Sequence, residues 1–269
     1  MAGLIDDAIE DYSIASLTDE PRTHLGISEI GKPCMRQTYY KFRWMAFEQF
    51  GGRMRRLFNR GHREEARFIG YLEAIGFKVF QHDENGEQFR CTGVLGHYGG
   101  SCDGVAYPPW FPTIPFLLEF KTHNQNSFNK YLDKGLGKHK PEHYDQMCGY
   151  GYKMNIHYGL YFPENKNDDD IQVTAIKLDH QRGAQLERKA EEIILAKQPP
   201  PKISENPAYQ ECKFCHFSKI CHEGATPVKN CRSCRQAEAR DNAEWFCNRW
   251  NAIIPSEHIK SGCDEWWPI

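Results

Sequence analysis

The sequence predicts an α/β protein with a mixed central sheet flanked by helices, followed by a small cysteine-rich module. Segments with the two-residue alternation of strands lie between longer segments with helical spacing. Three consecutive prolines, Pro199 to Pro201, mark the end of that region. Seven of the eleven cysteines follow, between Cys212 and Cys263. We therefore expect a core domain over residues 1–224 and a module over residues 225–269.

The composition is that of a globular protein without a membrane span. The chain has 269 residues, of which 40% are hydrophobic and 26% charged, and no apolar run reaches the length of a membrane-spanning helix. Its acidic start lacks the layout of a secretion signal, so we expect a cytoplasmic protein whose cysteines bind metal rather than form disulfides. The net charge of -2 requires that any phosphate binding come from a local basic patch.

Two helices are expected before residue 50. Residues 1–20 have the pattern of an acidic helix. Ser28 is the expected N-cap of a second helix, which continues past Pro33 to Tyr40 and has Cys34 near its start.

A long helix is expected over residues 54–75, with Gly76 at its end. Helical spacing places His62 on the inward apolar stripe together with Phe58. The helix also carries an arginine-rich patch, which either neutralises DNA phosphates or is an ordinary solvated face. The expected DNA-binding residues of this patch are Arg53, Arg56, Arg60 and Arg63.

Four extended segments follow and predict a bent antiparallel meander. Asn85-Gly86 is a tight-turn signal between the first two segments. The segment with Asp103 is expected to be continuous, and the segment with Glu119 is apolar. The four segments are residues 77–82, 88–91, 98–107 and 115–121.

The remainder of the core alternates helices with strands. Pro141 is expected to open a helix that ends at Met154, on which Gln146 and Tyr150 share one face. The later elements are two strands over residues 156–162 and 171–178, joined by an acidic turn at 165–170, and a polar helix over 179–197.

Asp103, Glu119 and Lys121 are the candidate catalytic residues. A hairpin between their two segments would bring the three side chains together. Two carboxylates and the neutral imidazole of His62 could bind a divalent metal and leave positions for water and a phosphate oxygen. Lys121 could then orient or deprotonate the attacking water, or stabilise charge on the phosphorane. By themselves these residues are also compatible with a solvated strand edge and, for His62, with a core histidine.

The order of four motifs resembles a known nuclease family. Gly61-His62, Gly100-Ser-Cys-Asp103, Glu119-Phe-Lys121 and Gln146-x3-Tyr150 follow one another along the chain. This order is similar to the RecB-like branch of the PD-(D/E)xK nuclease superfamily, and the resemblance covers roughly residues 28 to 222.

The resemblance implies a restriction-endonuclease-like core and a role for each motif residue. Its Mg²⁺ or Mn²⁺ ligands would be His62, Asp103, Glu119 and the carbonyl of Phe120. Lys121 would be the catalytic lysine, and Gln146 and Tyr150 would position DNA. Glu65 would hold a second ion or a water, although an exposed helix charge is the expected role for this residue.

A first cysteine set contains Cys212, Cys215 and Cys221, whose spacing lets one loop present three thiolates to zinc or to an iron-sulfur cluster. The fourth Cas family of CRISPR adaptation exonucleases and the iron-sulfur RecB-like helicase-nucleases place one cysteine before the core and three after it. Cys34 matches the first position. The resemblance therefore implies a 4Fe-4S cluster that closes the core, with a zinc staple on the same ligands as the alternative. The other core cysteines, expected as small buried hydrophobes, are Cys91, Cys102 and Cys148.

The tail carries a second set, whose single Cys-x2-Cys knuckle predicts a structural zinc in a zinc-ribbon-like module. His258 or His222 could replace one thiolate. The nearby aromatic side chains either form the small core of the module or stack on single-stranded bases, and we expect packing. The cysteines are Cys231, Cys234, Cys247 and Cys263, and the aromatic residues are Trp245, Phe246, Trp250, Trp266 and Trp267.

The function expected from the residues and the resemblance is Mg²⁺- or Mn²⁺-dependent hydrolysis of DNA from single-stranded or frayed ends, in replication or recombination. The chain would be a stand-alone nuclease of phage type, located in the host cytoplasm in that case. Two alternatives are a prespacer-trimming subunit of CRISPR adaptation and a non-catalytic iron-sulfur protein that binds DNA. Besides DNA, its partners would be recombination or CRISPR-adaptation proteins, or a second copy of the chain.

Overall fold

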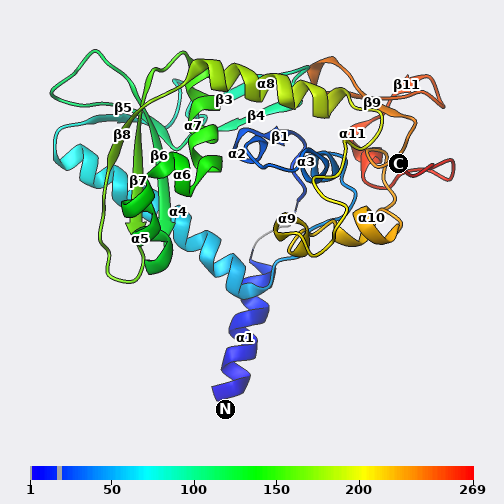
Figure 1. Cartoon of the computed structure of the whole chain (residues 1–269), viewed down its shortest axis with the longest axis horizontal. Coiled ribbons are helices and arrows are strands. Elements are labelled where there is room, and N and C mark those ends of the chain that lie inside the picture. Colours follow the sequence, from blue (N-terminus) through cyan, green and yellow to red (C-terminus); the bar gives the residue numbers. More distant parts are fainter. Residues whose placement is uncertain (1, 17–19) are drawn as a thin grey trace. The chain divides into compact units, whose positions relative to one another are not determined.

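The computed structural model describes residues 2–16 and 20–269 (Figure 1). Residues 17–19, within the expected first helix, lie outside the described residues. The chain folds into two compact units, each made of separated stretches of sequence. Unit 1 contains residues 1–20, 49–91 and 101–183, and unit 2 contains residues 21–48, 92–100 and 184–269. Among the described helices, none combines the length and the apolar character needed to cross a membrane.

The core of unit 1 is a five-stranded mixed sheet in the order β2-β5-β6-β7-β8. Strands β5 and β6 form an antiparallel pair that aligns Gly104 with Leu118, while β6 and β7 are parallel. The two outer pairs are antiparallel. The expected mixed sheet is confirmed, with strands β2 (Lys78–Phe80), β5 (Gly104–Tyr107), β6 (Phe116–His123), β7 (Tyr158–Asn165) and β8 (Thr174–Lys177).

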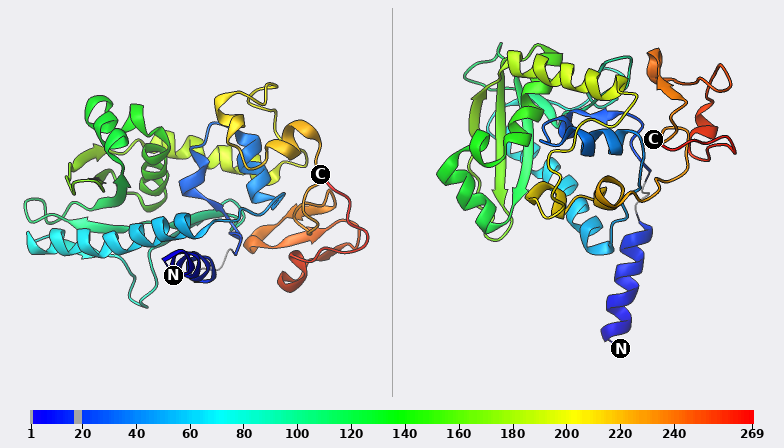
Figure 2. Two further views of the ribbon diagram at one scale, coloured as in Figure 1. Left: turned by 90° about the horizontal axis from the view of Figure 1, so that it is seen from below. Right: turned by 45° about the vertical axis from the view of Figure 1, so that its right-hand side comes forward.

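Helices cover both faces of this sheet, as the turned view in Figure 2 shows. The helix α4 (Gly52–Ala74) lies on one face and buries Phe68 against Phe120 and Phe162, whose rings lie 5.2 and 5.6 Å from its own. The alternation of β6 turns Glu119 to the opposite face, where α7 (Pro141–Met154) contacts it through a hydrogen bond from Gln146. One strand therefore supplies both a core face and a polar face.

The chain around α7 follows the predicted pattern, with additions. The helix has the predicted bounds, and the Asn165 N–H donates to the carbonyl of Asp170 at 2.8 Å in the predicted acidic turn. Two helices between β6 and α7 have no counterpart in the sequence prediction because their apolar positions are few. They are α5 (Gln125–Lys134) and α6 (Leu136–His139).

The segment 98–107 is not one continuous strand, contrary to the prediction. Tyr98–Ser101 forms β4, which joins β1 (Leu25–Gly26) and β3 (Arg90–Gly93) in a separate sheet. The chain then bends at Gly104, whose φ of 154° and close approach to the carbonyl of Phe80 favour glycine. Asp103 lies at this bend, directly before β5.

The early helices also differ from the prediction. The segment after Ser28 contains two short helices, α2 (Ile27–Ile30) and α3 (Met35–Phe42), in place of one. Cys34, rather than Ser28, caps α3, because its Sγ accepts the N–H of Gln37 at 3.4 Å.

The core of unit 2 is built around a buried arginine. The guanidinium of Arg232 lies over the rings of Phe42, Trp44 and Trp245 at 4.6, 4.3 and 4.8 Å. It donates to the carbonyls of Phe42 and Thr23, the latter at 3.0 Å. These contacts join residues near the start of the chain to the knuckle that holds Cys231 and Cys234.

The remaining elements lie mostly in unit 2. The α8 helix (His180–Leu195) begins in unit 1 and continues into unit 2. Two short helices, a three-stranded antiparallel sheet in the order β11-β10-β9 and two helical turns follow. They are α9 (Gln210–Lys213), α10 (Ser218–Glu223), β9 (Ala237–Ala239), η1 (Asp241–Ala243), β10 (Trp245–Cys247), β11 (Ala252–Ile253) and α11 (Ser256–Ile259).

Phe68→Ala is expected to lower the free energy of unfolding by about 3–5 kcal/mol, because it opens a cavity between α4 and the sheet. Urea unfolding followed by circular dichroism measures this change. Tyr71→Ala is the matched control on the same helix, since Tyr71 is 45% exposed, and it should cost about 1 kcal/mol or less. Equal losses in the two variants would contradict the packing described for Phe68.

Candidate catalytic site and cysteine clusters

The hairpin of β5 and β6 brings Asp103, Glu119 and Lys121 together. Asp103 accepts the N–H of Phe120 through Oδ2 at 2.7 Å. Lys121 forms an ion pair with Glu119, and its Nζ also donates to the carbonyl of Phe120 at 3.1 Å. The predicted convergence of two carboxylates and an amine therefore matches the structure of unit 1.

Two residues of the α7 helix contact the same site through hydrogen bonds. Gln146 Nε2 donates to Glu119 Oε2 at 2.9 Å, which fixes the carboxylate between an amide and an ammonium group. Tyr150 lies one turn further along, and its hydroxyl donates to the carbonyl of Ser101 at 2.7 Å. Tyr150 is buried at 3% exposure, so its contact supports the bend that carries Asp103.

His62 does not lie on the inward stripe, and this prediction was wrong. Its side chain is 75% exposed, and Nδ1 lies 3.4 Å from Glu65 Oε1. The helical spacing gave a wrong prediction for His62 because Phe58, the residue used to define the inward stripe, is itself exposed. The His62 ring therefore lies at the surface of α4, next to a carboxylate.

Glu65 belongs to the electrostatic environment of the site, contrary to its expected role as an exposed helix charge. Its side chain is partly buried. Burial and the nearby carboxylate of Asp103 raise the pKa of Glu65, while His62 and Lys121 lower it. The signal in the sequence was its position three residues after His62, which puts both side chains on one face of the helix.

Burial shifts the pKa values of Glu119 and Lys121. Complete burial raises the pKa of Glu119 to about 8, although the ammonium of Lys121 acts in the opposite direction. Burial lowers the pKa of Lys121, but the carboxylates of Glu119 and Asp103 outweigh it and raise the pKa above its ordinary value. The lysine is therefore a cation in this environment, and a divalent cation near Glu119 would favour the ionised carboxylate.

The donors around Lys121 are hard oxygen atoms, which suit Mg²⁺ or Mn²⁺. They are the carboxylates of Asp103, Glu119 and Glu65, with the carbonyl of Phe120 beside them. In residues 2–16 and 20–269, however, the structure contains no ready-made group of three or more His, Cys, Asp or Glu side chains that could hold a metal ion. Metal binding would therefore have to draw these ligands together.

The arginine-rich patch of α4 is already engaged in part. Arg56 pairs with Glu10 at 3.0 Å, and Arg60 lies 3.8 Å from Glu64 and donates to the carbonyl of Lys166. Arg53 and Arg63 are exposed. Part of the positive charge of this helix therefore serves internal ion pairs.

The first cysteine set lines one cavity in unit 2. The four thiols come from the cap of α3 and from the α9–α10 segment. Burial and the nearby thiols of Cys34 and Cys221 raise the pKa of Cys212. Arg36 also lines the cavity, with Nη1 4.0 Å from the Sγ of Cys221. Cys34, Cys212, Cys215 and Cys221 therefore share one cavity, although in the described part of the chain their thiols do not form a ready-made metal site.

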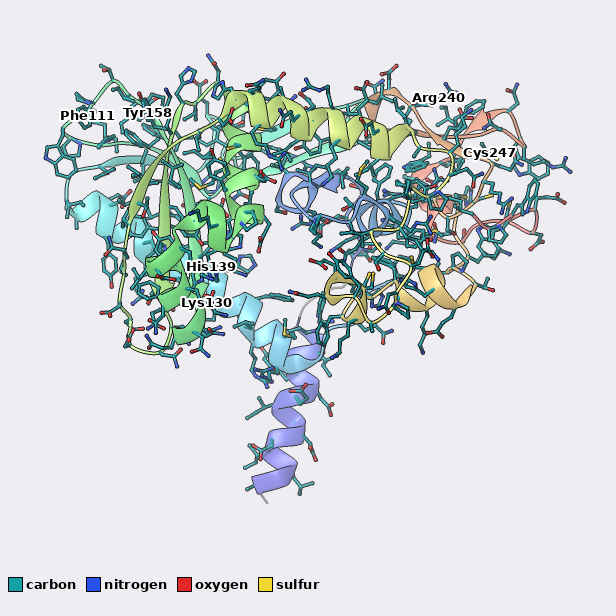
Figure 3. The ribbon with its side chains drawn as sticks, viewed as in Figure 1. Phe111, Lys130, His139, Tyr158, Arg240 and Cys247 are labelled. Atoms are coloured by element: carbon teal, nitrogen blue, oxygen red, sulfur yellow. The ribbon has the colours of Figure 1, made fainter. Side chains whose placement is uncertain are left out.

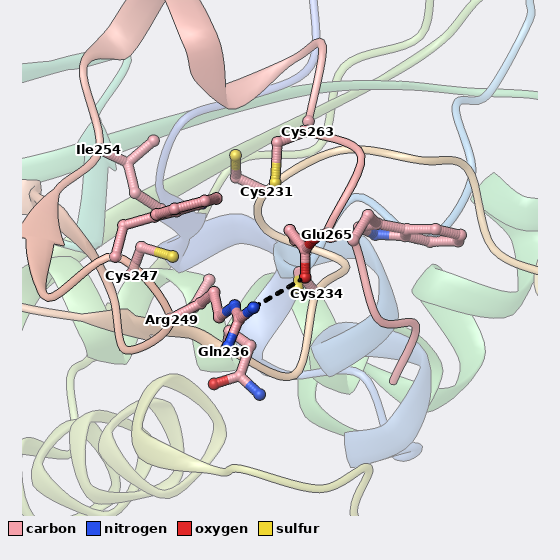
Figure 4. Close-up of a pocket in the computed structure, with 12 residues that line it drawn as sticks. Cys231, Cys234, Gln236, Cys247, Arg249, Ile254, Cys263 and Glu265 are labelled. Carbon is pink, nitrogen blue, oxygen red and sulfur yellow. Dashed lines mark ion pairs between the residues drawn. The ribbon is translucent and has the colours of Figure 1, made fainter.

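The second cysteine set lines a separate cavity in unit 2, shown in Figure 4. Burial, followed by the thiols of Cys263, Cys234 and Cys247, raises the pKa of Cys231 to about 11. The Trp267 N–H donates to Cys234 Sγ at 3.4 Å. The four cysteines of this set share one lining, but they too form no ready-made metal site among the described residues.

The histidine and aromatic neighbours of these cavities have different roles. His258 contacts Cys231 through its carbonyl, whereas His222 lines the first cavity. Trp245 is buried at 2% exposure, which agrees with packing, but Trp250 is 60% exposed. The expectation of a purely structural aromatic cluster therefore holds for Trp245 and does not describe Trp250.

The scattered cysteines match their expected environment. Cys91, Cys102 and Cys148 are all buried in unit 1. Burial raises the pKa of each of these thiols, which keeps them neutral. They are therefore small core residues of unit 1.

No protein-family model and no curated protein matches the chain. Among solved structures, the chain is similar to SSO0001, with 16% identity and a TM-score of 0.46 over 81% of this chain and 96% of that chain. It is also similar to the alkaline exonuclease LHK-Exo from Laribacter hongkongensis, with 16% identity and a TM-score of 0.47. That match covers 68% of this chain and 90% of that chain. For the complex of LHK-Exo with dAMP, the sequence identity is 17% and the TM-score is 0.47. The match covers 68% of this chain and 89% of that chain.

Glu119→Gln should reduce the pH dependence of stability in metal-free buffer with EDTA. Because the folded pKa of Glu119 is raised to about 8 from 4.5, its protonated form favours the folded state. That contribution is complete below the unfolded pKa and is lost as the pH rises through about 8. From about pH 6 to about pH 8, the wild type should lose about 2 kcal/mol more than the variant, as measured by urea unfolding. Glu73→Gln, an exposed change on α4, should behave like the wild type, and equal pH profiles for wild type and Glu119→Gln would refute the assignment.

Proposed function

We propose that this chain is a metal-dependent DNA exonuclease that hydrolyses phosphodiester bonds at single-stranded or frayed ends. One observation carries the proposal: Gln146 of α7 holds Glu119, which pairs with Lys121 beside Asp103. The sequence order of these residues resembles the RecB-like nucleases of the PD-(D/E)xK superfamily. The contacts support the resemblance because they unite motifs that are far apart in the sequence.

Each residue has a chemical role in this proposal. Asp103, Glu119 and the carbonyl of Phe120 would hold Mg²⁺ or Mn²⁺, which supplies a Lewis acid for a phosphate oxygen. Lys121 would position the attacking water and stabilise negative charge at the phosphorus. Gln146 would keep the Glu119 carboxylate in one orientation. His62 would add a ligand from α4, with Glu65 as the carboxylate that orients its ring.

The biological setting is also part of the proposal. A stand-alone nuclease in replication or recombination, of the kind that phages encode, agrees with the catalytic set. A prespacer-trimming subunit of CRISPR adaptation uses the same chemistry and would be distinguished by co-purification with an integrase. The presence of Lys121 next to two carboxylates argues against a non-catalytic DNA-binding protein.

The two cysteine sets would bind different metals. We assign a 4Fe-4S cluster to the set with Cys34, because its one-plus-three arrangement resembles the iron-sulfur nucleases. The tail set, with its Cys231-x2-Cys234 knuckle, would bind structural zinc. The cluster would tie α3 to the α9–α10 segment, and the zinc would join the knuckle to Cys247 of β10 and to Cys263.

Lys121→Ala should lower the rate of DNA cleavage by about a hundred-fold to ten-thousand-fold, because the water and the phosphorane lose their ammonium partner. Oligonucleotides labelled at either end, with Mg²⁺ and Mn²⁺ compared, measure the rate and the polarity. Lys177→Ala is the matched control, since Lys177 is exposed on β8 of the same sheet. Unchanged metal-dependent cleavage by Lys121→Ala would show that the assigned site is wrong.

Cys212→Ser and Cys263→Ser should separate the two metals and serve as controls for each other. Protein purified without air should be brown, and Cys212→Ser should lose iron and visible absorbance but retain zinc. Cys263→Ser should lose zinc and retain iron. Elemental analysis measures both metals, and a colourless wild type that contains only zinc would contradict the cluster.

A further inference from the structure

A second polar cluster continues from the catalytic strand. Because side chains alternate along β6, His123 points to the same face as Glu119 and Lys121. His123 is buried, with 4% exposure, and its ring lies 6.2 Å from that of His143 and 6.3 Å from that of His139. No residue of this cluster has a role in the site described above.

Hydrogen bonds connect the cluster from α7 to α6. Tyr161 OH lies 2.9 Å from His143 Nδ1 and 2.8 Å from His123 Nε2. His123 Nδ1 lies 2.8 Å from Ser127 Oγ, which lies 3.0 Å from His139 Nε2. This network, from His143 through Tyr161, His123 and Ser127 to His139, connects the α5–α6 segment to β6, the strand that carries Lys121.

The imidazoles of the network are neutral, whereas the charges around them are positive. Burial and then the cations Lys140 and Lys121 lower the pKa of His123 to about 4, and burial and Lys121 lower that of His143 to about 3. Burial and then Lys140, Lys130 and Lys134 also lower the pKa of His139, although Glu142 acts in the opposite direction. The network thus lies in a positive potential that begins at the catalytic lysine.

The outer part of this surface is a group of exposed lysines on α5 and α6. Lys130 and Lys134 lie three and seven residues after Ser127, which places them on the face of α5 that contacts the histidines. Gly135, with a φ of 71°, then turns the chain into α6, which carries Lys138 and His139. Figure 3 labels Lys130 and His139 on these two helices.

These lysines lack the ion pairs that engage the arginines of α4. Lys130, Lys134 and Lys138 form no ion pair with any residue in the described part of the chain, whereas Lys140 lies 3.4 Å from Glu142. From Gln125 to Lys140, Asp133 is the single acidic residue against four lysines. The α5–α6 segment therefore presents three exposed lysines without ion pairs in the described part of the chain.

We propose that Lys130, Lys134 and Lys138, with His139 beside them, bind the phosphate backbone of the DNA strand that enters the catalytic site. The inference rests on the proposed nuclease function and names the surface that holds its substrate. Exposed lysines that have no carboxylate partner can contact phosphates at little desolvation cost, and they release counterions from the strand. The histidine network keeps α5 and α6 in register with Lys121, so that bound phosphates lead toward the site.

The test compares two triple variants of the full chain that lose equal charge. The first changes Lys130, Lys134 and Lys138 to Ala, and the control changes Lys78, Lys153 and Lys177 of the same unit to Ala. Binding of a fluorescent single-stranded oligonucleotide is measured in EDTA by anisotropy from about 50 to about 200 mM salt. The slope of log affinity against log salt should fall by about 2 to 3 in the first variant and by less than 1 in the control.

Cleavage in Mn²⁺ separates this inference from the proposed function. A wild type that cleaves DNA, with equal salt slopes for the two triple variants, would overturn the lysine surface and leave the nuclease proposal intact. A wild type that binds DNA with the predicted difference in slope, but does not cleave, would remove the nuclease proposal and retain the surface. Circular dichroism and melting temperatures close to those of the wild type confirm that both triple variants preserve the fold.

Discussion

The burial of the Glu119 carboxylate is the constraint on which the candidate site depends. A carboxyl group inside a protein requires polar partners, and for Glu119 they are the ammonium of Lys121 and the amide of Gln146. Lys121 lies two residues after Glu119 on the same strand, so the alternation of side chains along β6 already places both on one face. Gln146 requires that α7 pack on the polar face of the sheet. The position of one side chain therefore ties the hairpin, the sheet and a helix from later in the sequence to one place.

One face of β6 packs into the hydrophobic core, and the other carries the candidate catalytic residues. Leu118 and Phe120 point toward α4 and join its apolar cluster, whereas Glu119, Lys121 and His123 point the other way. If the face of β6 that carries Glu119 were open to solvent, water would reach the carboxylate. The helices α5, α6 and α7 therefore have to cover this face. Their covering layer is itself polar where it meets the strand, and the histidine network with Tyr161 satisfies these buried groups without adding charge.

Unit 2 combines buried hydrophobic side chains with two buried arginines. Arg232 and Arg43 occupy its interior, where they lie against aromatic rings and donate to backbone carbonyls. Burial lowers the pKa of both guanidinium groups, which shows the cost of this arrangement. Thiolate-bound metals in the two cysteine cavities would add cross-links that such a core lacks.

The sequence by itself determined the features that depend on local periodicity and spacing. Two-residue alternation placed Glu119 and Lys121 on one face, and Pro141 marked the start of α7. Cysteine spacing grouped Cys212, Cys215 and Cys221, and the family resemblance added Cys34 to them. Tertiary structure decided the outward position of His62, the inward electrostatic role of Glu65, and the break before Gly104. It also decided the histidine network and the burial of Arg232. The physical reason is that burial and electrostatic environment depend on partners distant in sequence, which no local pattern encodes.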